Sequence, residues 1–422
     1  MAPTMPAPGD LLTLTIEKPA AGGRMIARAD GLVVLVAGAI PGERVRARIE
    51  RVSKGIAWAQ TSAIDDASPD RRDAGADPAC GGCLYAHIAY RRQLAIKALV
   101  IADAFARIGR MSLPAAVDVA SSAEEGYRMR ARLHAQRGRL GFYREGTHQL
   151  CDPAQTRQLL PATLDVLRRI EAALHPLAAG ALRELVLAEN IDASERTIAL
   201  DLATPVESSC LTPLTEIEGV TGLVAGETVV SGSPYVTDRV IVEGGADVLL
   251  RRHVLAFFQG SRYLFGDLIR HVSSRIGEAS EVLDLYAGGG AFAVGVARTR
   301  GTRVTAVEGD PVAASDLMAN AASAGETVTP VRASVEAFLD RARTRPQAAI
   351  LDPPRTGLSR EALAGLLRLA PPRIVYVSCD VPTLARDLRA MVERSYRVVE
   401  AQAFDLFPNT PHVETVVVLD RI

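Results

Sequence analysis

Two short apolar runs near the C-terminus each end in a residue with a reactive side chain. Residues 348–351 (AAIL) lead directly into Asp352, and residues 374–377 (IVYV) lead through Ser378 into Cys379. Short apolar runs that stop at a polar residue or proline are typical of strands buried in a parallel sheet. Because open α/β sheets bind ligands at the edge where such strands end, we predict that a carboxylate and a thiol meet at one sheet edge.

A glycine-rich turn upstream predicts a cofactor site at the same edge. The strand-like run that contains Asp284 continues into Tyr286 and residues 288–290 (GGG), and glycines let the backbone approach a ligand closely. Glu308 ends the next apolar run, where an acid suits the hydroxyls of a ribose. The turn lacks the third glycine of a dinucleotide motif, so a nucleoside without a pyrophosphate, such as S-adenosylmethionine, fits better. A structural turn without a ligand is the alternative.

The composition is that of a globular protein with several domains. The 422 residues suggest about two to three domains, and the mean hydropathy is +0.12. No apolar stretch reaches about 18 residues and no signal peptide is recognisable, so we expect no membrane segment and a cytoplasmic location. A net charge of −1 excludes a global basic field. The positive charge is nearly all arginine, which genomic base composition explains as readily as phosphate binding does.

The cysteines indicate a reducing compartment. There are five, an odd number, in a long chain with no export signal. Cys80 and Cys83 form a C-x2-C pair, which is typical of a metal or redox site. Two free thiols in a tight turn are the plain alternative.

Three regions follow from the residue patterns. Residues 1–65 contain short alternating runs and predict a small β-barrel. Residues 66–250 predict a mixed α+β central domain, in which arginines alternate with aromatic residues between Tyr127 and Arg144. That alternation suits an RNA-binding surface, although a solvated hairpin has a similar pattern. Residues 251–422 form the α/β cofactor domain.

Six blocks of the C-terminal region carry a resemblance to a known family. They are residues 257–259 (FFQ), 284–290 (DLYAGGG), 307–309 (VEG), 352–358 (DPPRTGL), 378–387 (SCDVPTLARD) and 405–414 (DLFPNTPHVE). In this order they resemble the S-adenosylmethionine-dependent RNA uracil-5-methyltransferases, which make 5-methyluridine in ribosomal and transfer RNA. The N-terminal region resembles the TRAM domain, an OB-like barrel of the ribosomal branch, most clearly at residues 41–45 (PGERV).

The resemblance implies a fold, a cofactor and roles for single residues. It implies a class I Rossmann-like methyltransferase domain that uses S-adenosyl-L-methionine, and an RNA partner, with ribosomal RNA favoured over transfer RNA. Cys379 is the candidate nucleophile that adds to C6 of uracil, and Glu414 is the candidate base that removes the C5 proton. The positions that match the family's cofactor contacts are Gln259, Tyr286, Glu308 and Asp352. We also expect a monomer.

The chain departs from the iron–sulfur members of this family. Cys80 and Cys83 match two of four cysteine ligands, whereas Ala74 and Thr156 occupy the other two positions and Cys151 lies five residues from the last. Because a [4Fe-4S] cluster is held by four thiolates, we expect no stable cluster and no metal site.

Two other functions stay open from sequence. A cytosine-C5 methyltransferase also uses a cysteine, but in a Pro-Cys motif, whereas Cys379 follows a serine. A non-catalytic RNA-binding protein of the same architecture would not need Cys379, Glu414 and Asp352. Phe257 or Phe258 could stack on a flipped-out uracil, or both could belong to the core. His412 is either an orienting residue or a plain surface residue.

Overall fold

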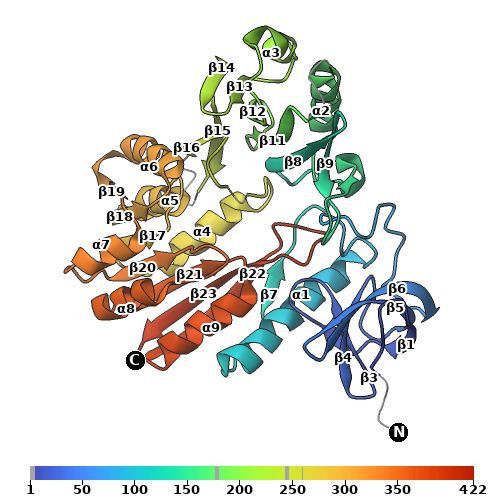
Figure 1. Ribbon diagram of the computed structural model, residues 1–422. Coiled ribbons are helices and arrows are strands. Elements are labelled where there is room, and N and C mark those ends of the chain that lie inside the picture. Colours follow the sequence, from blue (N-terminus) through green and yellow to red (C-terminus); the bar gives the residue numbers. More distant parts are fainter. Residues whose placement is uncertain (1–4, 176–179, 243–246, 259) are drawn as a thin grey trace.

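The N-terminal part of the computed structural model is a sheet of six strands (Figure 1). The structure describes residues 5–175, 180–242, 247–258 and 260–422, and within them this sheet has the order β1-β5-β6-β4-β3-β2. Its strands are β1 (Leu11–Thr15), β2 (Lys18–Pro19), β3 (Met25–Ala29), β4 (Leu32–Ala37), β5 (Arg44–Ser53) and β6 (Ile56–Asp66). Along β5, exposed Arg44, Arg46 and Arg48 alternate with buried residues, so this arginine row faces solvent.

A second sheet follows, with seven strands in the described ranges and the order β10-β9-β8-β11-β12-β13-β14. Its strands are β8 (Arg130–Gln136), β9 (Arg139–Tyr143), β10 (Leu150–Cys151), β11 (Leu182–Glu189), β12 (Arg196–Leu202), β13 (Gly222–Ala225) and β14 (Thr228–Gly232). Helices α2 (Pro161–Leu174) and α3 (Ser208–Thr215) share its apolar core. A hairpin of β15 (Tyr235–Ile241) and β16 (Asp247–His253) then leads to the third sheet.

Within the described residues, the third sheet has the strand order β19-β18-β17-β20-β21-β23-β22-β7. Its strands are β7 (Asp118–Ala120), β17 (Glu281–Leu285), β18 (Arg303–Glu308), β19 (Val328–Arg332), β20 (Ala348–Leu351), β21 (Arg373–Ser378), β22 (Tyr396–Phe404) and β23 (Glu414–Arg421). The five strands from β19 to β21 in this order are parallel, and β23 is antiparallel to both of its neighbours. The two apolar runs of the first prediction are therefore confirmed as neighbouring parallel strands.

Helices cover both faces of this sheet (Figure 1). One apolar cluster includes side chains of α4 (Phe265–Arg275), α5 (Ala291–Arg300) and α6 (Pro311–Ala324). The other includes side chains of α7 (Val335–Arg341), α8 (Arg360–Leu369), α9 (Val381–Val392) and α1 (Tyr90–Ala104). Two helical layers around a mostly parallel sheet confirm the predicted Rossmann-like fold class. Among the described residues, no helix is long and apolar enough to span a membrane.

Part of the predicted central region packs with the C-terminal sheet. Strand β7 pairs in parallel with β22, and α1 lies against α9. Helix α1 begins at Tyr90, and most of the backbone between Cys83 and Tyr90 forms turns. Segments far apart in sequence therefore meet beside the C-terminal sheet.

Candidate active site

Four of the predicted site residues lie at one edge of the C-terminal sheet. Leu285 of β17 is in register with Val307 of β18 and with Leu351 of β20, and Leu351 is in register with Tyr376 of β21. The residues at or just after these strand ends are Tyr286, Glu308, Asp352 and Cys379. The predicted convergence is therefore present. Gln259 lies outside the described residues.

The glycine turn after β17 is held in an unusual backbone conformation. Tyr286, Gly288 and Gly290 have φ values of 62°, 54° and 86°, in the left-handed region that favours glycine. A Cβ on Gly290 would lie 2.6 Å from Cδ1 of Leu317, so side-chain packing also requires glycine there. The half-buried Tyr286 takes this conformation despite its side chain, and such strain is concentrated at functional sites.

Glu308 is tied directly to this turn. Its Oε2 accepts a hydrogen bond from the Gly288 N–H at 2.8 Å, and its Oε1 accepts one from the Asp310 N–H at 2.7 Å. The carboxylate is half-buried, so it remains accessible from the edge of the sheet. The second strand therefore presents an acid in a fixed orientation beside the glycine turn.

Three carboxyl groups share the edge, and the pKa values of two of them, Asp284 and Asp352, are raised. Burial, then Asp352 and Glu308, hold the pKa of fully buried Asp284 well above its ordinary value. The Asp352 side chain reaches solvent at the rim, yet protein surrounds most of its carboxyl, and this surrounding protein and then Glu308 raise its pKa to about 7. S-adenosylmethionine carries a sulfonium and an ammonium group, and this acidic edge offers them compensating charge. The residues present therefore fit this cofactor.

The strand register brings Cys379 and Glu414 together. Strand β21 is antiparallel to β23, with Ser378 opposite Thr415, so the next residues outward on the two strands are Cys379 and Glu414. Cys379 is half-exposed and immediately precedes α9, whose N-cap Asp380 accepts a hydrogen bond from the Thr383 N–H at 2.9 Å. A helix N-terminus stabilises nearby negative charge, and a nucleophilic thiolate carries such charge. Glu414 is 3% exposed.

Asp387 is a supporting residue that the sequence patterns did not single out. Its buried Oδ2 accepts hydrogen bonds from the Leu358 N–H at 2.9 Å and from the Tyr376 hydroxyl at 2.7 Å. It thereby fixes the end of the loop that follows Asp352. Its place in the block 378–387 was a signal of importance, but only the tertiary contacts give its role.

The structure bears on the alternatives that the sequence left open for Phe257, Phe258 and His412. Phe258 packs against the guanidinium of Arg252, 3.8 Å from its ring centre, and against the ring of Phe265. Phe257 is 75% exposed, so its ring is the one presented to solvent. His412 is partly buried, and burial together with nearby cations, Arg355 first, lowers its pKa to about 4. It is therefore uncharged at neutral pH.

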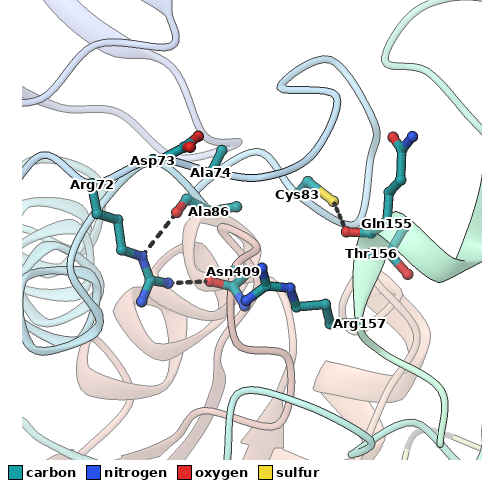
Figure 2. A pocket seen from close by; sticks show the side chains of 9 residues that line it. All are labelled: Arg72, Asp73, Ala74, Cys83, Ala86, Gln155, Thr156, Arg157 and Asn409. Atoms are coloured by element: carbon teal, nitrogen blue, oxygen red, sulfur yellow. Dashed lines mark hydrogen bonds between the residues drawn. The ribbon is translucent and has the colours of Figure 1, made fainter. Parts of the chain in front are cut away.

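The cysteine pair lies in a separate corner of the molecule. Cys80 forms a disulfide with Cys151, so the two-free-thiol interpretation of the C-x2-C pair is wrong for Cys80, while Cys83 is a buried free thiol. Ala74, Cys83 and Thr156 line one cavity of about 80 Å³ (Figure 2). Three of the four positions that match the family's ligands, Ala74, Cys83 and Thr156, therefore lie together. Cys80 and Cys151 are bonded to each other, and Cys83 packs with them in a buried apolar cluster.

This corner does not fit a four-thiolate cluster. The Thr156 hydroxyl donates to the Pro153 carbonyl at 2.7 Å, and the Cys83 thiol donates to the Gln155 carbonyl at 3.8 Å. Burial, and then Asp77, raise the pKa of Cys83 to about 11, which opposes formation of a thiolate ligand. Among the described residues, no group of three His, Cys, Asp or Glu side chains is arranged to hold a metal ion.

Family models match most of the chain. The model described as tRNA (Uracil-5-)-methyltransferase matches residues 177–422, and the TRAM domain model matches residues 7–61. The chain belongs to the tRNA (uracil-5-)-methyltransferase family. It is therefore an S-adenosylmethionine-dependent RNA uracil-C5 methyltransferase, and the predicted resemblance is confirmed.

Relatives extend this similarity over nearly the full length. A 23S rRNA (uracil(1939)-C(5))-methyltransferase RlmD of Halomonas elongata is 32% identical, covering 97% of this chain and 89% of the relative. The RlmD of Methylococcus capsulatus is 31% identical, covering 99% and 98%. The crystal structure of a Pyrococcus abyssi tRNA (uracil-54, C5)-methyltransferase with S-adenosyl-L-homocysteine superposes with a TM-score of 0.77 at 24% identity, covering 96% of this chain and 99% of that one. That structure shares the fold.

Proposed function

We propose that this chain methylates C5 of a uridine in 23S ribosomal RNA. The proposal is supported by two relatives above 30% identity that carry this activity in their names and match along almost the whole chain. The TRAM match at residues 7–61 supports an RNA-binding role for the N-terminal sheet. A transfer RNA substrate is the alternative, suggested by the structural neighbour of similar fold.

The cofactor site in this proposal is the acidic edge. S-adenosylmethionine, when bound, supplies an electrophilic methyl group. Glu308 would hold the two ribose hydroxyls, Tyr286 would pack on the nucleoside, and Asp352 would face the amino-acid end beside the target base. The support is that Glu308 is oriented by the Gly288 N–H at the glycine turn. Gln259 joins this set on the strength of the family motif alone.

Cys379 acts as the nucleophile in the proposed mechanism. Its thiolate bonds to C6 of uracil while the C5=C6 electron pair moves toward C5 and O4, which makes C5 nucleophilic. C5 then takes the methyl group, and S-adenosylhomocysteine leaves. The half-exposed position of Cys379 at the N-terminus of α9 supports this role, because the thiol must reach a base from outside the protein.

Glu414 completes the cycle as the base. Its carboxylate removes the C5 proton, the electron pair re-forms C5=C6, and the Cys379 thiolate is expelled. The single observation that carries the mechanism is the antiparallel register of β21 and β23, in which Ser378 opposite Thr415 makes Cys379 and Glu414 neighbours. Phe257, with its exposed ring, is the residue proposed to stack on the displaced uracil.

Two variants test the mechanism because they interrupt different steps. Cys379→Ala should bind RNA but form no covalent adduct and transfer no methyl group. Glu414→Gln should attack and methylate, then accumulate a protein–RNA band that survives denaturing electrophoresis, since elimination requires loss of the C5 proton. If Cys379→Ala retained methyl transfer within about tenfold of wild type, a barrier change of only about 1.4 kcal/mol, nucleophilic catalysis by Cys379 would be refuted.

The RNA target needs an experiment of its own. Mass spectrometry of ribosomal and transfer RNA from cells lacking the protein should show one methyluridine missing from 23S ribosomal RNA. Loss from transfer RNA instead would reverse the choice of substrate while leaving the chemistry intact. The proposal includes no iron–sulfur cluster. A monomeric state and a cytoplasmic location stay predictions.

A further inference from the structure

The loop between β22 and β23, residues 405–413, is held by hydrogen bonds from residues outside the C-terminal region. This loop leads directly into Glu414, the first residue of β23. Its contacts come from α1 and from the segments on either side of α1. The contributing residues are Arg72, Tyr85, Gln93, Lys97 and Tyr127.

Asn409 is the most constrained residue of the loop. Its φ of 64° lies in the left-handed region, and it is 6% exposed. Its N–H donates to Oε1 of Gln93 at 2.9 Å, and its Oδ1 accepts from Nε2 of Gln93 at 2.9 Å. Oδ1 also accepts from Arg72 at 2.8 Å, as Figure 2 shows, and the backbone carbonyl accepts from the Tyr85 N–H at 2.9 Å. The backbone and the side chain of Asn409 are therefore both held.

Two further anchors lie on either side of Asn409. The Lys97 ammonium donates to Oδ1 of Asp405 at 2.5 Å, and both side chains are at most 1% exposed. The Tyr127 hydroxyl, also buried, donates to the Pro408 carbonyl at 3.0 Å. Lys97 is one of only three lysines in a chain whose cations are otherwise arginines. A buried ion pair is an expensive way to gain stability, and its best-attested use is to specify one arrangement.

The sheet places Cys379 and Glu414 in different ways. Cys379 follows the last residue of β21 and leads through Asp380 into α9, whereas Glu414 pairs with Phe404 of β22 and comes directly after the loop. Glu414 is the first residue of β23, so a peptide bond joins it directly to the loop of residues 405–413, and no such bond joins Cys379 to that loop. Loosening that loop should therefore displace the Glu414 carboxylate more than the Cys379 thiol.

We propose that Gln93, Lys97 and Tyr127 are positioning residues for Glu414, which control removal of the C5 proton rather than attack at C6. This inference rests on the proposed role of Glu414 as the base. In it, residues 405–413 form a rigid support whose geometry is set by α1 and its flanking segments. Loss of an anchor slows elimination and leaves more enzyme attached to methylated RNA.

The test uses two tyrosines in matched settings. Tyr127→Phe removes a buried hydrogen bond to the Pro408 carbonyl in the loop. Tyr396→Phe removes a buried hydrogen bond of 2.8 Å to the Pro371 carbonyl, at the start of β22 and away from the site edge. Both variants lose one hydroxyl that donates to a proline carbonyl, so their effects on stability should be similar. Gln93→Leu is a second, stronger change to the loop.

Each full-length variant is given S-adenosylmethionine and unmodified ribosomal RNA from cells lacking the protein. Single-turnover methyl transfer measures attack, and the fraction of enzyme in a denaturation-resistant RNA band measures stalled elimination. Tyr127→Phe and Gln93→Leu should transfer methyl near the wild-type rate but release product about tenfold more slowly, with a matching rise of the band, since a small misplacement of a catalytic group has effects of this size. Tyr396→Phe should behave as wild type.

The possible outcomes distinguish failure of the positioning role from failure of the assignment of Glu414 as the base. Suppose that Glu414→Gln accumulates the adduct but Tyr127→Phe shows the same product release and the same fraction of RNA-bound enzyme as Tyr396→Phe. The positioning role is then refuted, and the assignment of Glu414 as the base stands. If Glu414→Gln forms no adduct, the base assignment fails, and the positioning role fails with it. If Tyr127→Phe slows methyl transfer and product release equally, its role is structural, and the proposal is refuted.

Discussion

The raised pKa of Asp352 predicts how cofactor binding responds to pH. The Asp352 carboxyl has a pKa of about 7 in the free protein, so it is mostly protonated at pH 6 and mostly ionised at pH 8. The ammonium group of S-adenosylhomocysteine stays charged over this range. If only the ionised carboxylate binds it well, affinity should rise between pH 6 and pH 8 by at most about tenfold, or about 1.4 kcal/mol. Solvent at the exposed rim screens the interaction and lowers this figure.

The folding stability of the ligand-free protein should fall as the pH rises, whereas the affinity for the ligand should increase. A carboxyl whose pKa is higher in the folded than in the unfolded protein favours folding while protonated, and loses that contribution as pH rises through the folded value. The ligand-free protein should therefore lose stability between about pH 4 and pH 7. Bound S-adenosylhomocysteine should offset the loss, so the increase in Tm caused by the ligand should grow with pH.

Calorimetric titration with S-adenosylhomocysteine at pH 6, 7 and 8 measures the effect, and Asp352→Asn is the isosteric control. The variant should bind more weakly at pH 8 and show little pH dependence. An affinity of the wild type that is flat across this range would refute the reasoning. A slope that persists in Asp352→Asn would assign the titration to another group, with Asp284 the foremost candidate because its pKa is also raised.

Three further predictions concern the same regions. Glu308→Ala should greatly weaken S-adenosylhomocysteine binding in calorimetry, because the glycine turn loses the acceptor of its Gly288 N–H; equal affinity for NAD and none for S-adenosylhomocysteine would contradict the cofactor. Gly290→Ala should lower the Tm more than Gly301→Ala. Both glycines have a positive φ, which strains an alanine by about 1 kcal/mol at either position. Only at position 290 would the new Cβ also meet a neighbour, Cδ1 of Leu317 at 2.6 Å. Anaerobically purified protein should lack cluster absorbance and iron; near-stoichiometric iron lost in Cys80→Ser would contradict this.

The catalytic edge could be predicted because its signals are local. A buried parallel strand reads as an unbroken apolar run, and the residue after the run marks the edge, so Asp352 and Cys379 were placed from sequence alone. Glu308 followed from the next run in the same way. The relation of Cys379 to Glu414 was implied only by family resemblance, since antiparallel pairing of β21 with β23 has no signature in either strand.

The supports of the site have no local signal. Gln93 and Asn409 are 316 residues apart, and neither lies in a pattern that relates them. No sequence pattern indicates that α1 lies against α9 or that Lys97 is buried inside the protein. The turns before Tyr90 likewise depend on contacts such as that of Tyr85 with the loop. Long-range polar contacts of this kind are determined by the packed structure rather than by propensity.

The cysteine corner and the loop before Glu414 meet at Arg72 and Asn409, which line the same cavity as Cys83 (Figure 2). The Arg72 guanidinium donates to the Ala86 carbonyl in the corner and to Oδ1 of Asn409 in the loop (Figure 2). None of the side chains that hold Asn409 is a cysteine; in the described residues they are the guanidinium of Arg72 and the amide of Gln93. Support of the loop therefore does not depend on thiolate ligands. This hydrogen-bonded anchor holds the loop before the proposed base in a chain that has Ala74 and Thr156 where the family has two cysteine ligands.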